Sequence, residues 1–233
     1  MCYDVVDKAV LAAAAYGRLQ REGPEAVRDL VTVDDASLAI CESVRRDSGN
    51  GIFVVPHCAG SVLATVEFAR RFPTMVLVRE SKSEHRGRIF REYFERLGAE
   101  ILYVRRAEPA SIARAILRAL NAGKFIIGTT DLLRRTDDTV EVVVFGRKAH
   151  LPAWPARFSA RRNVPILPGY IRMEEGRIIL TAGEPYIEPD LTAATQRWAS
   201  FFEQNFRRHP SDWVFMYEKR WSKLIGEAAR ERR

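Results

Sequence analysis

The sequence predicts a single α/β domain with a mostly parallel central sheet flanked by helices. Short apolar segments alternate with longer segments in which apolar residues recur at helical spacing, and this alternation favours parallel strands joined by crossover helices. The 233 residues also contain no internal repeat, low-complexity linker or abrupt change in composition. One domain is therefore the simplest organisation.

The first predicted elements are two helices and a buried strand. Helical spacing covers residues 5–21 and stops at Gly23-Pro24, and Asp35 is expected to cap a second helix over 36–46. Residues 52–55 form a β-branched and aromatic run that is typical of a buried strand, and Pro56 ends it because proline has no N–H for a ladder. The remaining predicted elements are helices at 62–71, 82–97, 109–121, 154–162 and from 191 onwards, and strands at 74–78, 100–104, 124–128, 140–145, 164–172 and 177–182.

Composition favours a soluble protein of a reducing compartment. Hydrophobic residues make up 47% and charged residues 29%, and no apolar run reaches the roughly 18 residues that a membrane-spanning helix needs. The first residues lack the plan of a secretory peptide, and Cys2, Cys41 and Cys58 form neither a disulfide framework nor a zinc spacing. We therefore expect a cytoplasmic protein without a metal site. We divide it into a helical N-terminal segment (1–34), the α/β domain (35–222) and a charged tail (223–233).

His57 is the candidate reactive residue, because it follows the buried strand and precedes a small-residue turn and a helix, where α/β proteins commonly place chemistry. The alternative is a histidine that only packs at a strand end. Its neighbour Cys58 is interpreted as a buried small side chain, and Ser61 as a helix cap rather than a nucleophile. Trp213 and Trp221 are interpreted as core or groove lining.

Several motifs occur in a fixed order along residues 35–222. They are His57 with its glycine turn, Arg79, Arg91 and Arg96 before Gly98, Gly123 before a strand ending in Asp131, Val144-Phe145-Gly146, the run 164–168, and His209-Pro210-Ser211-Asp212-Trp213 followed by Lys219-Arg220-Trp221. As an ordered set they resemble the lipid A late acyltransferase family, relatives of the glycerophosphate-type acyltransferases. The resemblance implies a glycerophosphate acyltransferase-like α/β fold.

The resemblance also implies acyl transfer from an acyl carrier protein or coenzyme A thioester to a hydroxyl or amine, without a cofactor or nucleic acid. His57 would be the general base. Backbone N–H groups at the start of the following helix, or an arginine, would stabilise the oxyanion. The formal net charge of +7 suits an acidic carrier or the anionic inner face of a membrane, to which the protein could attach peripherally.

The sequence departs from the family pattern at Val62. Members of the family normally carry a carboxylate five positions after the histidine, and valine can neither accept the ring N–H nor stabilise imidazolium. Asp131 and Glu80 are the candidate substitutes, because each follows the end of a different predicted strand; Asp131 is slightly favoured, although it could simply cap a turn. Without such a substitute, either His57 works alone at a reduced rate or the activity is lost.

The candidate substrate-binding residues are Arg79, Arg91, Arg96, Ser61 and Thr130. The arginines suit a phosphate or pantetheine arm, although arginines on amphipathic helices are usually solvated, and Arg79 is the best candidate because it follows a strand directly. Members usually begin with a membrane-anchoring segment, whereas this chain begins with a partly charged amphipathic helix. That difference favours a soluble or peripheral enzyme of specialised metabolism with a small or peptide-like acceptor. Two further functions stay open: a non-catalytic protein that binds acyl chains or carrier proteins, and a thioesterase-like hydrolase.

Overall fold

The computed structural model describes residues 2–79, 83–85, 87–88, 100–104 and 108–230. Its helices are α1 (Cys2–Glu22), α2 (Asp35–Ser48), α3 (Ser61–Arg71), α5 (Pro109–Asn121), α6 (Trp154–Arg162), α7 (Leu191–Arg208) and α8 (Lys219–Arg230), with 3-10 helices η1 (Pro24–Leu30), η2 (Pro210–Asp212) and η3 (Val214–Tyr217). Its strands are β1 (Val31–Val33), β2 (Ile52–Val55), β3 (Thr74–Val78), β4 (Glu100–Tyr103), β5 (Phe125–Thr129), β6 (Thr139–Val144), β7 (Arg147–Pro152), β8 (Ile166–Glu174) and β9 (Arg177–Ala182).

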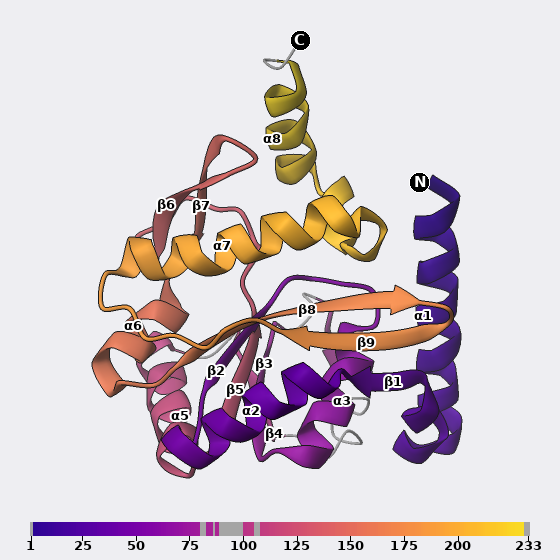
Figure 1. Cartoon of the computed structure of the whole chain (residues 1–233), viewed down its shortest axis with the longest axis horizontal. Coiled ribbons are helices and arrows are strands. Elements are labelled where there is room, and N and C mark those ends of the chain that lie inside the picture. The colour runs from indigo at the N-terminus through magenta and orange to yellow at the C-terminus, as the bar shows by residue number, and fades with distance from the viewer. Residues whose placement is uncertain (1, 80–82, 86, 89–99, 105–107, 231–233) are drawn as a thin grey trace.

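Seven strands form one sheet in the order β1-β9-β8-β2-β5-β3-β4 (Figure 1). Among the described strands of this sheet, β8 and β9 are the one antiparallel pair of neighbours. The central strand β2 lies between β8 and β5, and all four of its apolar side chains are buried. A near-continuous apolar run is what a strand covered on both faces requires. The predicted α/β class with a mostly parallel sheet is confirmed.

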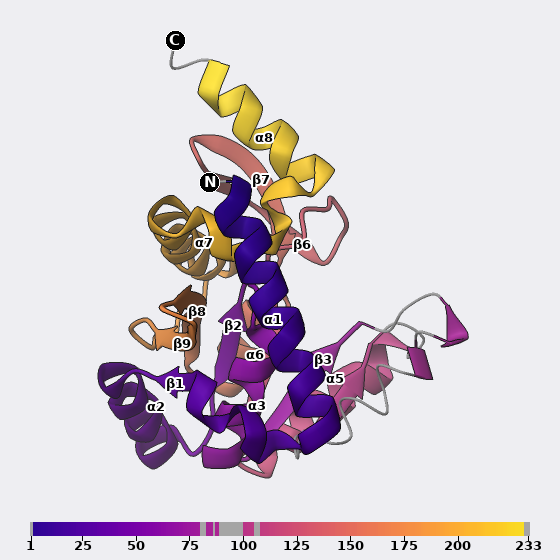
Figure 2. The ribbon, with the colours of Figure 1, turned by 90° about the vertical axis from the view of Figure 1, so that its right-hand side faces the viewer.

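Helices pack against this sheet and position its ends. α2 packs against β9, α3 against β1 and β9, α5 against β5, and α7 against β8 and the separate hairpin β6–β7. Helix α8 projects from the body beyond that hairpin (Figure 1). Seen from the side, α1 crosses the molecule from the region of α3 towards α7 (Figure 2), and it packs against η1 and η2.

Most of the predicted elements are confirmed, and α5 and α6 have the predicted bounds. The cap of α2 was wrongly assigned: the side chain of Asp34, rather than Asp35, accepts a hydrogen bond from the backbone N–H of Ser37. The sequence also carries no clear signal for β7, because its segment is polar and ends in proline. The turn before β7 holds Phe145 and Gly146 at positive φ, as a tight hairpin requires.

The two ends of the chain add detail to the predicted segments. Residues 1–34, expected to be helical, also contain the three-residue strand β1, which pairs with β9 and is too short to show a sequence period. Helix α8 continues across the boundary drawn at 222/223, and the division into three segments stays a prediction. Most of the helix predicted over 82–97 lies outside the described residues. Within the described part of the chain, every helix falls short of the length and hydrophobicity that a bilayer crossing needs.

Candidate active site

Two neighbouring parallel strands end at the candidate site. β2 and β5 pair with Val55 opposite Thr129. The chain runs two residues past each member of this pair to reach His57 and Asp131. Because parallel strands finish at the same edge of a sheet, the register itself brings these two residues together.

His57 and Asp131 are joined by two hydrogen bonds. The ring Nδ1 of His57 lies 2.5 Å from Oδ1 of Asp131, and the backbone N–H of His57 donates to Oδ2 at 3.0 Å. The histidine side chain is 35% exposed, whereas the carboxylate is 1% exposed. With Nδ1 as the donor to this buried carboxylate, the other ring nitrogen, Nε2, carries the free lone pair. A histidine in this state can accept a proton from a molecule that approaches from solvent.

The indole N–H groups of two tryptophans hold Asp131 in place. The indole N–H of Trp213 donates to Oδ2 of Asp131 at 2.9 Å, and that of Trp221 donates to the backbone oxygen of Asp131 at 2.7 Å. Both tryptophans are buried, and Trp213 stacks on Phe206 with ring centroids 3.7 Å apart. The sequence interpretation of the tryptophans as core was therefore incomplete, because their N–H groups act on the site. A buried tryptophan needs an acceptor, which was the available signal.

A large cavity opens beside the histidine ring. Its volume is about 680 Å³, and His57 is one of its lining residues. Phe215 also lines it and stacks on the imidazole with ring centroids 3.9 Å apart. The other lining side chains are mostly apolar, and they include Leu77, Val104, Ile112, Ile116, Trp154 and Phe158. Among the described residues, four arginines and one carboxylate line the same cavity, namely Arg79, Arg134, Arg157, Arg161 and Asp138, and Arg134 forms an ion pair with Asp138 at 2.8 Å. Such a site accommodates a long apolar group together with an anionic one.

The backbone N–H groups at the start of α3 are engaged within the protein. The N–H of Ala59 donates to the Asp212 carbonyl at 2.9 Å, and that of Ser61 to the Cys58 carbonyl at 3.2 Å. Burial raises the pKa of Tyr16 to about 12, and backbone hydrogen bonds from Val62 and Gly60 to its hydroxyl act in the opposite direction. Of the two expected sources of oxyanion donors, the cavity arginines are therefore better placed than this helix start.

The predicted substrate-binding residues have different environments. Arg79 lines the cavity together with His57. Glu80, Arg91 and Arg96 lie outside the described residues. Asp131 is therefore the candidate partner that contacts His57. The alternative partner, Glu80, lies outside the described residues.

Thr130 and Cys58 are buried, whereas Ser61 is half-buried. The Ser61 hydroxyl donates to the backbone oxygen of Cys58 and accepts from its N–H. The expected helix cap at Ser61 was wrong, because the N-cap of α3 is Gly60 and no side chain of the described residues caps this helix. Thr130 is fully buried, and in the described part of the chain it is not among the cavity-lining residues. Cys58 is buried as expected, and this burial raises the pKa of its thiol well above the ordinary value.

The acid expected from the family pattern has no substitute on α3. Val62 lies in the first turn of the helix and packs against the core. Glu67, the next acidic residue along the chain, is buried and forms ion pairs with Arg70 at 2.8 Å and Arg71 at 2.9 Å. The carboxylate at the histidine comes instead from the end of β5.

Comparison with known proteins agrees with the motif order. The profile of the family described as bacterial lipid A biosynthesis acyltransferase matches residues 9–223. The phosphatidylinositol mannoside acyltransferase of Mycobacterium tuberculosis (strain ATCC 25618 / H37Rv) is 29% identical over 185 residues, which are 77% of this chain and 57% of that protein. The protein of the same name from Mycolicibacterium smegmatis is 28% identical over 228 residues, 96% of this chain and 69% of that protein.

The chain thus spans little more than half the length of the M. tuberculosis relative, although the family profile covers most of the chain itself. The resemblance found in the sequence motifs is confirmed by both comparisons. The chain belongs to the bacterial lipid A biosynthesis acyltransferase family.

Proposed function

We propose that the protein transfers an acyl group from a thioester donor to a hydroxyl or amine acceptor in lipid biosynthesis, with His57 as the general base and Asp131 as its acidic partner. The observation that carries this proposal is the 2.5 Å contact between Nδ1 of His57 and the buried Asp131, beside an open cavity. Membership of an acyltransferase family supports the reaction class.

The proton path follows from the orientation of the ring. Asp131 holds the proton on Nδ1, so Nε2 of His57 accepts the acceptor proton as its oxygen or nitrogen attacks the thioester carbonyl carbon. The carbon–sulfur bond then breaks, and the leaving thiolate takes the proton from Nε2. Asp131 stabilises the imidazolium that exists between the two proton transfers. A cavity arginine stabilises the oxyanion.

The cavity suits a donor with an acyl chain and an anionic arm. Its apolar side chains would cover the chain, and its arginines would bind phosphate oxygens of coenzyme A or of a carrier-linked pantetheine. Replacing Arg79 with alanine should therefore raise the KM for acyl-coenzyme A about tenfold, the loss expected for one charge-assisted hydrogen bond. An unchanged KM would exclude Arg79 from donor binding.

The acceptor is proposed to be a hydroxyl of a membrane glycolipid, because the similar mycobacterial proteins are named for acylating phosphatidylinositol mannoside. Helix α1 exposes Val6, Val10 and Leu11, and the chain has a surplus of basic residues. Exposed apolar side chains with basic charge favour peripheral attachment to an anionic bilayer. In a density gradient, we expect the protein to float with phosphatidylglycerol vesicles but not with phosphatidylcholine vesicles. Recovery of the protein only in the bottom fraction with both kinds of vesicle would contradict this attachment.

A transfer assay tests the proposed function. The purified protein is incubated with acyl-coenzyme A or acyl carrier protein, each with and without phosphatidylinositol mannoside and a panel of simple alcohols and amines. We expect acylated acceptor by mass spectrometry, in step with release of the free thiol. Release of free fatty acid at the same rate without an acceptor would indicate a thioesterase. Saturable donor binding without any release would indicate a non-catalytic binding protein.

A further inference from the structure

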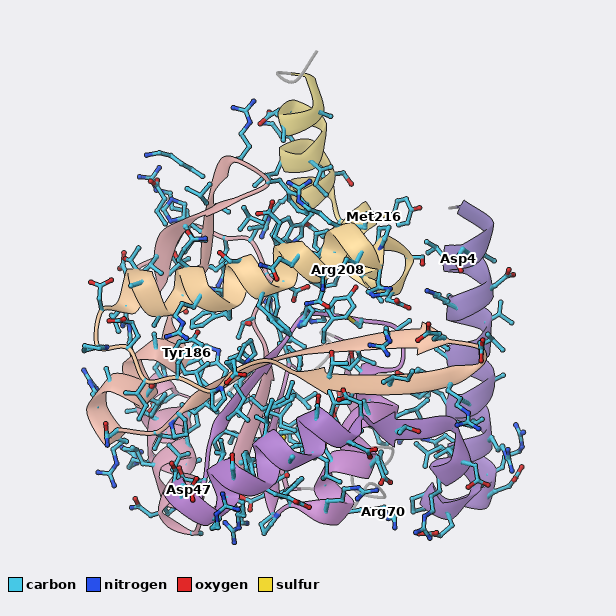
Figure 3. The ribbon with its side chains drawn as sticks, in the orientation of Figure 1. Asp4, Asp47, Arg70, Tyr186, Arg208 and Met216 are labelled. Atoms are coloured by element: carbon cyan, nitrogen blue, oxygen red, sulfur yellow. The ribbon has the colours of Figure 1, made fainter. Side chains whose placement is uncertain are left out.

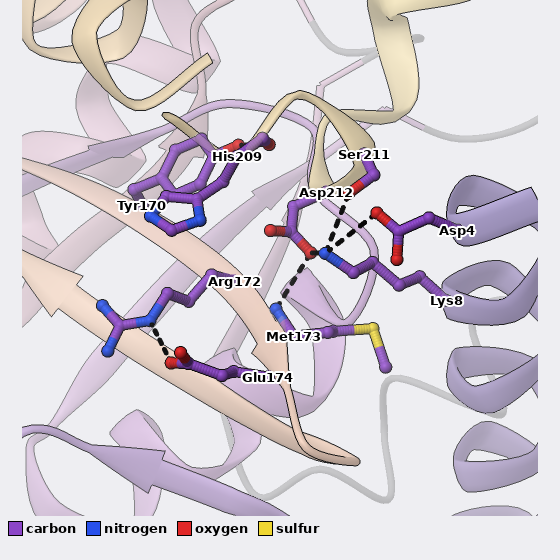
Figure 4. Close-up of polar contacts among 9 residues, drawn as sticks. All are labelled: Asp4, Lys8, Tyr170, Arg172, Met173, Glu174, His209, Ser211 and Asp212. Carbon is purple, nitrogen blue, oxygen red and sulfur yellow. Dashed lines mark hydrogen bonds and ion pairs between the residues drawn. The ribbon is translucent and has the colours of Figure 1, made fainter. Parts of the chain in front are cut away.

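A buried ion pair joins the N-terminal helix to the segment that follows α7. The Nζ of Lys8 in α1 lies 2.9 Å from Oδ1 of Asp212 and 2.9 Å from the hydroxyl of Ser211 (Figure 4). Asp4, one helical turn earlier, lies 3.8 Å from the same ammonium group. The side chain of Asp212 is fully buried, and that of Lys8 is 15% exposed. This pair is therefore largely withdrawn from solvent.

Lys8 is the main compensation for the buried charge of Asp212. Burial raises the pKa of Asp212, and the hydrogen bond from Lys8 is the first of the interactions that lower it, followed by the backbone N–H of Met173 and the charge of His209. That N–H donates to Oδ1 at 2.9 Å, while Oδ2 has no hydrogen-bond partner among the described residues. Removing one member of such a pair leaves an uncompensated buried charge, so the carboxyl group must either take up a proton or move, and both change the contacts of the segment.

The backbone around Asp212 is bound directly to the loop that carries the histidine. The carbonyl oxygen of Asp212 accepts from the N–H of Ala59 at 2.9 Å. Two residues later, the N–H of Val214 donates to the carbonyl oxygen of His57 at 2.8 Å. These two bonds align the segment after α7 alongside residues 57–59. A displacement of Asp212 would therefore move the backbone of His57.

The side chains that follow Asp212 act on the catalytic pair itself. Trp213 donates to the Asp131 carboxylate, and Phe215 stacks on the His57 ring at an interplanar angle of 14°. The segment lies on the side of the molecule where α1 begins, as Met216 and Asp4 show in Figure 3, and α1 packs against η2. Helix α1 is thus linked to this segment by the Lys8–Asp212 ion pair.

We propose that Lys8 is a positioning residue for the His57–Asp131 pair: it neutralises Asp212 and so holds residues 212–215 against the site. The inference depends on the proposed acyl transfer for its kinetic consequences, but not for its structural ones. The competing explanation is that the ion pair only attaches α1 to the body. The two explanations differ in what happens to kcat and to the Trp213 indole when the charge is removed.

The experiment compares the parent with four single variants of the full chain, one of which is Asp212→Asn. Lys8→Met removes the charge and keeps an apolar stem, Lys8→Arg keeps the charge, and Lys148→Met removes an exposed lysine that pairs with Glu141 at 2.7 Å. We expect Lys8→Met to lower kcat about tenfold to 100-fold, the cost of a displaced catalytic group, with the donor KM within about twofold. Lys8→Arg should recover most of the parent rate, and Lys148→Met should match the parent.

A double variant and a spectroscopic signal complete the test. Lys8→Met combined with Asp212→Asn removes both buried charges, so its kcat should exceed that of Lys8→Met by about tenfold if the two residues are coupled. If Lys8→Met does not fold because Asp212 is left as an unpaired buried charge, the double variant should fold. In the nitrogen–proton correlation spectrum, the indole signal of Trp213 should shift in Lys8→Met and stay in place in Lys148→Met.

The outcomes separate the two hypotheses. A parent protein that transfers no acyl group refutes the proposed function, and the Trp213 signal still tests the positioning role. A Lys8→Met protein with the parent kcat and an unmoved Trp213 signal overturns the inference. So do losses in Lys8→Met and Asp212→Asn that simply add in the double variant, because additivity means that the residues do not act together.

Discussion

Replacing Asp131 with asparagine keeps the shape of the side chain and removes its charge. The carboxylate now accepts from three donors, the ring Nδ1 of His57 at Oδ1 and both the His57 backbone N–H and the Trp213 indole at Oδ2. An amide has one accepting oxygen. Its NH2 group would face two donors at the Oδ2 position but only one at the Oδ1 position. We therefore expect the amide nitrogen to lie next to Nδ1 of His57.

The consequence is a reversed histidine tautomer. An N–H donor from the amide makes Nδ1 of His57 the acceptor and moves the ring proton to Nε2, which can then no longer take a proton from the substrate. The expected loss in kcat is about 10³-fold, within the range that a general base contributes. The stability cost is expected to be smaller, about 1–3 kcal/mol, because the buried donors keep most of their partners.

Initial rates of thiol release, measured with a saturating acyl donor and acceptor, give this kcat. Asp190→Asn is the matched control, because Asp190 caps α7 on the surface by accepting from the N–H of Ala193, and asparagine caps a helix equally well. Thermal melting of both variants shows whether they are folded. An Asp131→Asn enzyme within about tenfold of the parent, a loss smaller than general-base catalysis implies, would refute the tautomer argument.

Four further substitutions concern residues near the pair and in the cavity wall. Val62→Asp should leave the transfer rate unchanged, because Asp131 already occupies the Nδ1 side of the ring; a marked rate increase would show that Asp131 is a poor partner. Cys58→Ala should keep most of the activity, since burial raises the pKa of this thiol and keeps it un-ionised at neutral pH, and an inactive but folded variant would point to an acyl-cysteine. Trp154→Ala should shift the donor preference to longer chains, by about fourfold per added methylene, the equivalent of ~0.8 kcal/mol. Gly128→Ala should shift the preference to shorter chains, because a Cβ there would lie 2.7 Å from the Trp154 ring and push it into the cavity. If neither substitution changes the order of rates across a series of donors, Trp154 does not determine chain length.

The sequence predicted the parts of the site that depend on local pattern. The apolar run of β2, its end at Pro56 and the strand before Asp131 are short-range features, and the rule that parallel strands end together joined His57 with Asp131 as one of two choices. The register that decides how closely they meet is a tertiary property. Val55 opposite Thr129 could not be read from either strand alone.

The support behind the pair was hidden for a different reason. Trp213 contacts Asp131 from 82 residues further along the chain, and no periodicity records which buried acceptor an indole will reach. The contact between Lys8 and Asp212 likewise joins the two ends of the sequence. In contrast, β7 was missed because its polar residues and terminal proline are unlike a buried strand.

The most direct test of the account is the rate of acyl transfer by His57→Ala, with donor affinity measured in parallel. We predict that kcat falls about 10²–10⁴-fold, since the proton acceptor is lost, while donor binding persists because the apolar walls and Arg79 are intact. A folded His57→Ala protein that transfers acyl groups at the parent rate would contradict the assignment of His57 as the base.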